Sequence, residues 1–165
     1  MSAIVRDAFT HEFDDIAKLL VEAYSEYASA LTPENWQTMQ TNLSKITEVA
    51  QQGRLIIAQL DRELVGAVVY CPPGTSDTRI FQPEWASLRM LAVSPQHRGQ
   101  GIGAQLSSEC IRRAKEDEAE IIGLHTSELM LPAIRMYERL GFDRDLVLPR
   151  RLGIQFWRYV LKLND

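Results

Sequence analysis

The sequence has few cysteines, few histidines and no cluster that combines them. Its 165 residues include two cysteines, Cys71 and Cys110, and three histidines, without a Cys-x-x-Cys pair. This composition argues against a disulfide-stabilised scaffold and offers no recognisable set of zinc ligands. We therefore expect two reduced thiols and no bound metal.

Long apolar runs and an excess of positive charge are also missing. No segment approaches the about 20 apolar residues that a membrane span needs. The formal net charge of −4 argues against nucleic-acid binding, which depends on many Lys or Arg contacts with phosphate. Residues 1–15 lack the apolar segment of a signal peptide. We expect a cytoplasmic protein that binds neither membranes nor nucleic acids, so any anion site must be local.

The first part of the chain predicts a short strand and two helices. The strand is expected at residues 4–9. Apolar residues then recur at three- and four-residue spacing over 11–27, which indicates an amphipathic helix with Thr10 as its N-cap. A second helix is expected over 33–53, with Thr32 as N-cap, a proline in the first turn and a glycine as the stop.

The remaining pattern is mostly of strands. We expect strands at 54–60, 63–71, 85–93, 120–126, 145–150 and 154–163, and helices at 102–118 and 131–140. In the third of these strands, Leu88, Met90 and Ala92 are expected on one face. Tight hairpins imply antiparallel pairs, whereas the segment 93–121 implies a right-handed parallel crossover.

These elements predict the α+β class in the order β-α-α-β-β-β-α-β-α-β-β. The expected architecture is a mixed, mostly antiparallel central sheet that is flanked by about four helices. No linker or repeat divides the chain, so residues 1–165 are expected to form a single domain.

Residues 91–106, LAVSPQHRGQGIGAQL, place three glycines after Arg98 at the start of a predicted helix. Unpaired amides and partial positive charge at a helix N-terminus make such a loop suitable for a phosphate, and Arg98 adds a charged donor. A glycine turn that only joins a strand to a helix is the structural alternative.

Two other phosphate-binding motifs fit this loop less well. Gly99, Gly101 and Ala104 match G-x-G-x-x-G/A, the dinucleotide fingerprint. That fingerprint normally follows the first strand of its domain, whereas about half of this chain precedes it. A P-loop is excluded because no Gly-Lys-Ser/Thr sequence follows the glycines.

Two motifs in the chain resemble those of one family. VSPQHRGQGIG, residues 93–103, resembles the acyl-CoA signature R/Q-x-x-G-x-G/A of the GNAT superfamily of N-acyltransferases, with Arg98, Gly101 and Gly103 at its fixed positions. AIRMYERLGF, residues 133–142, resembles the family's second helix motif, A-x-x-x-Y-x-x-x-G-F. The order of the elements is similar to that fold over nearly the whole chain. The resemblance implies transfer of an acetyl group from acetyl-CoA to a primary amine of a small molecule, amino acid or peptide.

The resemblance also implies how acetyl-CoA is held. Strand residues 91–93 would pair with the pantetheine arm, and the loop amides of 98–104 would hold the pyrophosphate. The implied cofactor-binding residues are Leu91, Ala92, Val93, Arg98, Gly99, Gln100, Gly101, Ile102, Gly103 and Ala104. Tyr137 is the implied general acid for the departing thiolate, and the amide of Val93 or a neighbour is the implied oxyanion donor.

Two departures from the family pattern concern catalysis. Met130 stands where many members have Asn, and Ser87 stands near the position of a common catalytic Glu. Glu84 is the nearest acid and therefore the candidate general base, with a solvated loop acid as the alternative reading. A non-catalytic acyl-CoA-binding module with the same fold remains an open alternative, as does the homodimer that is frequent among relatives.

Acceptor recognition is implied for the first two helices. Tyr24, Tyr27 and Trp36, with Glu26 nearby, would form an aromatic and acidic wall for an ammonium group. Core packing of these aromatics is the alternative. His125, at the end of a strand beside the expected cleft, is either a cleft residue or a structural one.

Overall fold

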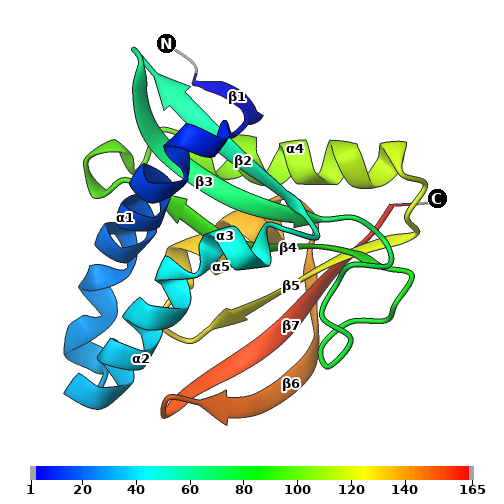
Figure 1. Cartoon of the computed structure of the whole chain (residues 1–165). Coiled ribbons are helices and arrows are strands. Elements are labelled where there is room, and N and C mark those ends of the chain that lie inside the picture. Colours follow the sequence, from blue (N-terminus) through cyan, green and yellow to red (C-terminus); the bar gives the residue numbers. More distant parts are fainter. Residues whose placement is uncertain (1–2, 164–165) are drawn as a thin grey trace.

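The computed structural model describes residues 3–163, and a seven-stranded sheet forms its centre (Figure 1). The strands, in the spatial order β1-β2-β3-β4-β5-β7-β6, are β1 (Ile4–Asp7), β2 (Arg54–Leu60), β3 (Glu63–Cys71), β4 (Ala86–Val93), β5 (Ile121–Ser127), β7 (Ile154–Lys162) and β6 (Asp143–Arg151). Only β4 and β5 are parallel neighbours; the other pairs are antiparallel. The predicted α+β class and the parallel crossover are confirmed.

Helices cover both faces of the sheet (Figure 1). They are α1 (Phe13–Tyr24), α2 (Pro33–Ser44), α3 (Ile46–Val49), α4 (Ile102–Glu116) and α5 (Leu131–Arg139), with 3-10 turns η1 (Thr10–Glu12), η2 (Ser25–Ala30) and η3 (Pro95–His97). The hydrophobic core has two parts, one on each face of the sheet, and β2 contributes to both because successive strand residues point to opposite faces. Ile56 and Ala58 pack with α4 and α5, whereas Leu55 and Ile57 pack with α1, α2 and α3.

The start of the first helix differs from the expectation. Thr10 is not an N-cap, because it begins the 3-10 turn η1. The N-cap of α1 is Glu12, whose side chain makes no capping bond to this helix. Glu12 Oε1 accepts a hydrogen bond from the N–H of Phe9, the residue before η1, at 2.8 Å. The same carboxylate pairs with Arg6 of β1 at 2.8 Å. Glu12 therefore joins the first strand to the helix that follows it.

The second predicted helix is two helices. Thr32 caps α2 as predicted, since its Oγ1 accepts a hydrogen bond from the Asn35 N–H at 3.1 Å. The helix ends at Lys45, with φ −88° and ψ 20°, and α3 begins at the next residue. Just before the break, the Ser44 hydroxyl donates to the Thr41 carbonyl at 2.8 Å, and such bonds compete with the helical ladder.

A bulge interrupts β4 at Met90, whose φ is +59°. The strand's register with β3 shifts at this place. Leu88 and Leu91 consequently pack with α4 and α5, whereas Met90 and Ala92 pack with α1 and α2. The expectation that Leu88, Met90 and Ala92 share one face was wrong, because the bulge reverses the alternation.

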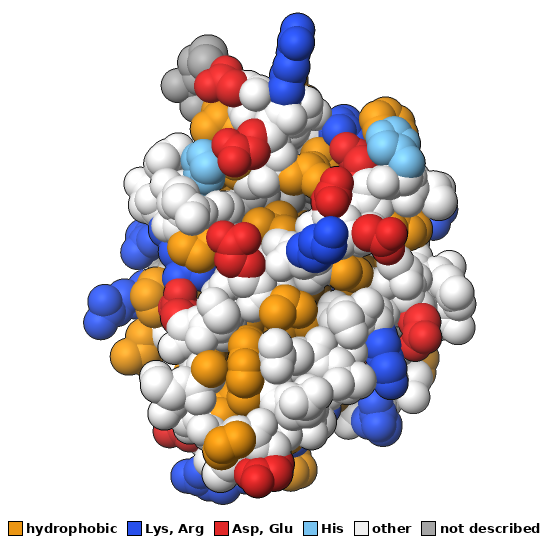
Figure 2. Space-filling model, turned by 60° about the vertical axis from the view of Figure 1, so that its left-hand side comes forward, with side chains coloured by type: hydrophobic (Ala, Val, Ile, Leu, Met, Phe, Trp, Pro, Cys, Tyr) orange, Lys and Arg blue, Asp and Glu red, His pale blue; other side chains and the backbone are white. Residues whose placement is uncertain are grey.

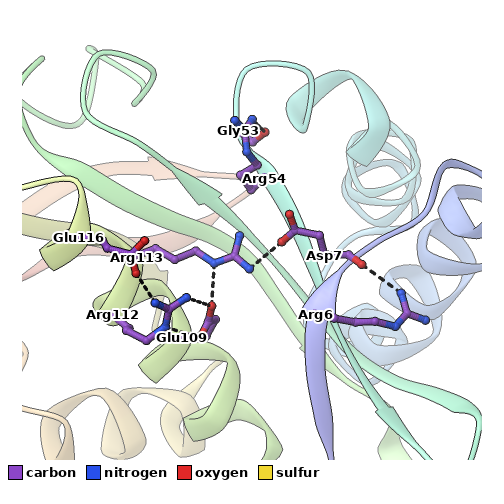
Figure 3. Close-up of polar contacts among 8 residues, drawn as sticks. All are labelled: Arg6, Asp7, Gly53, Arg54, Glu109, Arg112, Arg113 and Glu116. Carbon is purple, nitrogen blue, oxygen red and sulfur yellow. Dashed lines mark hydrogen bonds and ion pairs between the residues drawn. The ribbon is translucent and has the colours of Figure 1, made fainter.

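Ion pairs connect the edge strand β1 to α4 (Figure 3). Arg113 lies between Asp7 and Glu109, with N–O distances of 2.6 and 2.8 Å. On the same helix, Arg112 pairs with Glu109 and Glu116. These contacts fix the helix whose N-terminus carries the glycine loop.

The molecular surface has mixed charge. On the face that brings α1 and α2 forward, acidic and basic side chains are interspersed (Figure 2). Within residues 3–163, no helix has both the length and the apolar character that crossing a membrane requires. The thiols of Cys71 and Cys110 are buried and unpaired.

Candidate active site

The parallel strands β4 and β5 separate soon after they begin. They pair only at Ala86–Ile122 and Ser87–Gly123. Beyond this point β4 remains paired with β3, and β5 remains paired with β7. From Leu88 to Val93, no strand of residues 3–163 pairs with the edge of β4 that faces the gap. Side chains bind part of this edge, since Tyr24 donates to the Leu91 carbonyl and Arg98 Nε donates to the Val93 carbonyl at 3.4 Å.

A cavity of about 360 Å³ opens at this separation. This volume lies within the range of small-molecule sites, about 300–1,000 Å³. The cavity joins the open edge of β4, the glycine loop, the C-terminal end of α1 and the first turns of α5. Its lining residues are Ala23, Tyr24, Glu26, Tyr27, Leu88 to Val93, His97 to Gly99, Gly101 to Ala104, His125, Thr126, Met130, Pro132, Ala133, Met136, Tyr137 and Arg139.

The glycine loop leaves its amides without acceptors. From Gly99 to Ala104, no backbone N–H donates a loop or capping hydrogen bond within the described part of the chain. The first such donor is Gln105, which binds the Gly101 carbonyl at 3.0 Å. At Gly99 and Gly101, the space that a Cβ would occupy has no atom within 4 Å. Free amides at a helix N-terminus, in a loop with open space beside its glycines, fit a phosphate or pyrophosphate group.

The Arg98 side chain is engaged by the protein. Its Nη2 donates to the Ala23 carbonyl at 2.8 Å, and its Nη1 pairs with Glu26. Arg98 thereby links the glycine loop to the end of α1. Arg98 Nε also contacts the Val93 carbonyl at 3.4 Å, so three of the five guanidinium N–H donors are in use. Because it is paired with Arg98, Glu26 is not a free anion for an ammonium group.

Three tyrosines surround the cavity. The Tyr24 hydroxyl donates to the Leu91 carbonyl on the open edge of β4 at 2.9 Å, and its ring lies edge-on to Tyr27 at 5.8 Å. Tyr137 of α5 is buried against Phe142, and its hydroxyl has no hydrogen-bond partner within residues 3–163. Burial raises the pKa of Tyr137, and the nearby phenols of Tyr24 and Tyr27 act in the same direction. Tyr137 is therefore a protonated donor at neutral pH.

Four residues considered for the site lie outside the cavity lining, and one of them is Gln100 of the glycine loop, which was expected to bind the cofactor. Glu84 is exposed in the turn before β4, at the end where β4 and β5 are paired. Trp36 is half-buried against the core between α1 and α2. Ser87 is buried, with its Oγ 2.8 Å from that of Ser76. Met130 does line the cavity, where its sulfur accepts a bond from Thr126 at 3.5 Å.

Arg89 is a lining residue that the sequence analysis missed. The Ser87–Gly123 pair places Arg89 and His125, each two residues further on, on the same face of the neighbouring strands. Burial lowers the pKa of His125 to about 4, with Arg89 and Arg151 acting in the same direction, so its imidazole is neutral at pH 7. A charged residue inside an otherwise apolar strand was the available signal for Arg89.

The fold and the cavity together define the class of protein: a mixed sheet whose two parallel strands separate at a cavity, with free amides at a helix N-terminus and a buried tyrosine in the cavity lining. The chain belongs to the acetyltransferase (GNAT) family, whose model matches residues 13–142.

Individual relatives agree with this assignment. The chain is 31% identical over 119 residues to a probable N-acetyltransferase family 8 member 5 of Mus musculus, covering 66% of this chain and 47% of the relative. It is 31% identical over 144 residues to a mycothiol acetyltransferase of Sanguibacter keddieii, covering 85% of this chain and 44% of the relative. The chain thus spans about half the length of the curated relatives it matches.

Among solved structures, the fold is similar to that of yncA, a putative acetyltransferase from Salmonella typhimurium with its cofactor acetyl-CoA. The TM-score is 0.70 at 15% identity, over 100% of this chain and 96% of that one. This likeness shows the GNAT fold.

Proposed function

We propose that this protein is an N-acetyltransferase that moves the acetyl group of acetyl-CoA to a primary amine of a small molecule, amino acid or peptide. One observation carries the proposal: a single cavity is lined by Gly99 and Gly101 to Ala104, whose amides are free, by the open edge of β4 and by Tyr137. The pyrophosphate is assigned to the loop, and the amides of the pantetheine arm to the β4 edge over 91–93. The thioester then lies near Tyr137.

The proposed reaction is a direct attack on the thioester. The amine nitrogen forms a bond to the carbonyl carbon, and the oxyanion accepts a hydrogen bond from the amide of Val93 or a neighbour. The C–S bond then breaks, and the departing thiolate takes the proton of Tyr137. The proton lost by the amine goes to solvent, which also reprotonates Tyr137. Because Glu84 is exposed and outside the lining, a role as base would require intervening water.

The test measures thiol release from acetyl-CoA with a broad amine panel. Tyr137→Phe should lower turnover by about 10²- to 10⁴-fold, the usual contribution of a general acid. Its folding stability should stay close to that of the wild type, since the hydroxyl bonds to no residue of the described chain. Thermal stabilisation by acetyl-CoA should also remain.

Tyr70→Phe is the matched control. Tyr70 is equally buried and lies outside the cavity lining, and its hydroxyl donates to Asp117 at 2.7 Å. This variant should lose stability and keep turnover, the opposite of Tyr137→Phe. Equal turnover losses in both variants would contradict the role of Tyr137.

A non-catalytic acyl-CoA-binding module is the second candidate. It is favoured by the lining itself, in which the only carboxylate within residues 3–163 is that of Glu26, already paired with Arg98. It predicts stabilisation by acetyl-CoA without thiol release on any amine.

A further inference from the structure

Arg89 and His125 face the gap between β4 and β5 from the side opposite to Tyr137. Along these strands Leu88 and Leu124 pack with α4 and α5, so Arg89 and His125 point to the other face of the sheet. Tyr137 belongs to the α4 and α5 side. The two sides of one cavity are therefore chemically different, with the Tyr137 phenol on one side and the Arg89 guanidinium and the neutral His125 imidazole on the other.

Arg89 and His125 each have one buried polar atom without a hydrogen-bond partner in the described residues. These atoms are Arg89 Nε and His125 Nδ1. A buried donor without an acceptor is unfavourable, above all when it is charged. Because both residues line the cavity, a ligand can supply the missing acceptor.

The nearby carboxylate does not fill this role. Both oxygens of Asp77 accept hydrogen bonds from Arg79, at 3.1 and 2.9 Å. These bonds lower the pKa of Asp77, and the charge of Arg89 acts in the same direction. Arg151 adds further positive charge near His125. The local balance of charge is thus positive, in a protein whose net charge is −4.

The surroundings of His125 are apolar. The rings of Phe81 and Phe156 lie 6.4 and 6.0 Å from the imidazole, measured between ring centroids. Apolar walls lower the effective dielectric and strengthen a charge-assisted hydrogen bond. Such a place favours a carboxylate, whose two oxygens match the parallel donors of a guanidinium.

We propose that Arg89, with His125, binds a carboxylate of the acceptor, so that the acceptor is an amine that carries its own carboxylate, such as an amino acid. This inference rests on the proposed acetyltransferase function and names its substrate class. It differs from the aromatic and acidic wall expected from Tyr24, Tyr27 and Glu26, because Glu26 is neutralised by Arg98.

The experiment compares matched acceptors that differ only in the carboxylate. Thiol release from acetyl-CoA is measured with phenylalanine and phenylalaninamide, methionine and methioninamide, and the dipeptides Ala-Asp and Ala-Asn. The readout is the ratio of kcat/KM for the acid to that for its amide, in the wild type and in Arg89→Gln. The acid and its amide differ in the pKa of the amine. This difference affects the ratio equally in the wild type and in Arg89→Gln, so it cancels when the two ratios are compared.

The expected result is a ratio that falls by about 10- to 100-fold in Arg89→Gln, the effect of losing a hydrogen bond between charged groups. Most of the change should lie in KM for the acid. Arg89→Lys keeps the positive charge but lacks the paired donors of the guanidinium, so it should give an intermediate ratio. This variant also tests the proposal if Arg89→Gln does not fold. Arg112→Gln, an equal charge change at an exposed site on α4, should leave the ratio unchanged.

The outcomes separate the two proposals. Thiol release with an unchanged acid-to-amide ratio in both Arg89 variants would overturn the carboxylate site and leave the acetyltransferase function standing. A fall in the ratio confined to Ala-Asp would overturn the free amino acid as acceptor. No thiol release with any amine would overturn the proposed function, and the acceptor site with it.

Discussion

Gly101, the N-cap of α4, and Gly103, within its first turn, should change stability with opposite signs when replaced by alanine. Gly101 has φ +80°, a left-handed conformation that costs an L-residue about 1–2 kcal/mol. Gly103 lies in the first turn of α4, and a Cβ there would stand 3.6 to 3.8 Å from three side chains, which is ordinary van der Waals contact. Alanine in a helix is favoured over glycine by up to about 1 kcal/mol.

Gly101→Ala should therefore lower the free energy of unfolding by about 1 kcal/mol, whereas Gly103→Ala should raise it by about 0.5 kcal/mol. Urea denaturation at pH 7 measures both, and the midpoints of thermal unfolding should differ by about 3–6 °C. Acetyl-CoA should stabilise Gly101→Ala less than the wild type, because the free amides shift with the backbone. A stability of Gly101→Ala equal to that of the wild type would refute the left-handed conformation at the start of α4.

Two further predictions concern stability. Thr32→Ala removes the N-cap of α2 and should cost about 1 kcal/mol in urea denaturation, and Thr32→Asn, which can also cap, should restore most of it. The hydrogen bond from Arg6 lowers the pKa of Glu12 from 4.5 to about 2, so its stabilising contribution is complete above about pH 5 and is lost as the pH falls from 4.5 towards 2. The difference in unfolding free energy between the wild type and Glu12→Gln should shrink over that range, and a difference that grows on acidification would contradict the pairing.

Most of the fold could be predicted from the sequence, because period and capping are local properties. The strand and helix order, the Thr32 cap and the hairpin at Asp61 and Arg62 follow from residues that are close in the chain. The errors occur where a neighbouring group competed with the local preference. A 3-10 turn that begins at Thr10 precedes the first helix, with the Phe9 N–H bound by Glu12, and the Ser44 hydroxyl bonds to the Thr41 carbonyl just before the break at Lys45.

By itself the sequence determined the family resemblance and predicted the glycine loop as an anion site, since both depend on short motifs, each within one segment of the chain. The tertiary structure alone decided which side chains share the cavity. The gap between β4 and β5 lies between strands that are distant in the sequence, and the ion pair between Arg98 and Glu26 also joins distant segments. The register at Ser87–Gly123 places Arg89 and His125 on the same face of neighbouring strands, and the bulge at Met90 turns Met90 away from the face of Leu88. The spacing of residues along one strand contains neither of these facts. That Glu84 and Trp36 lie outside the cavity is likewise known only from the tertiary structure.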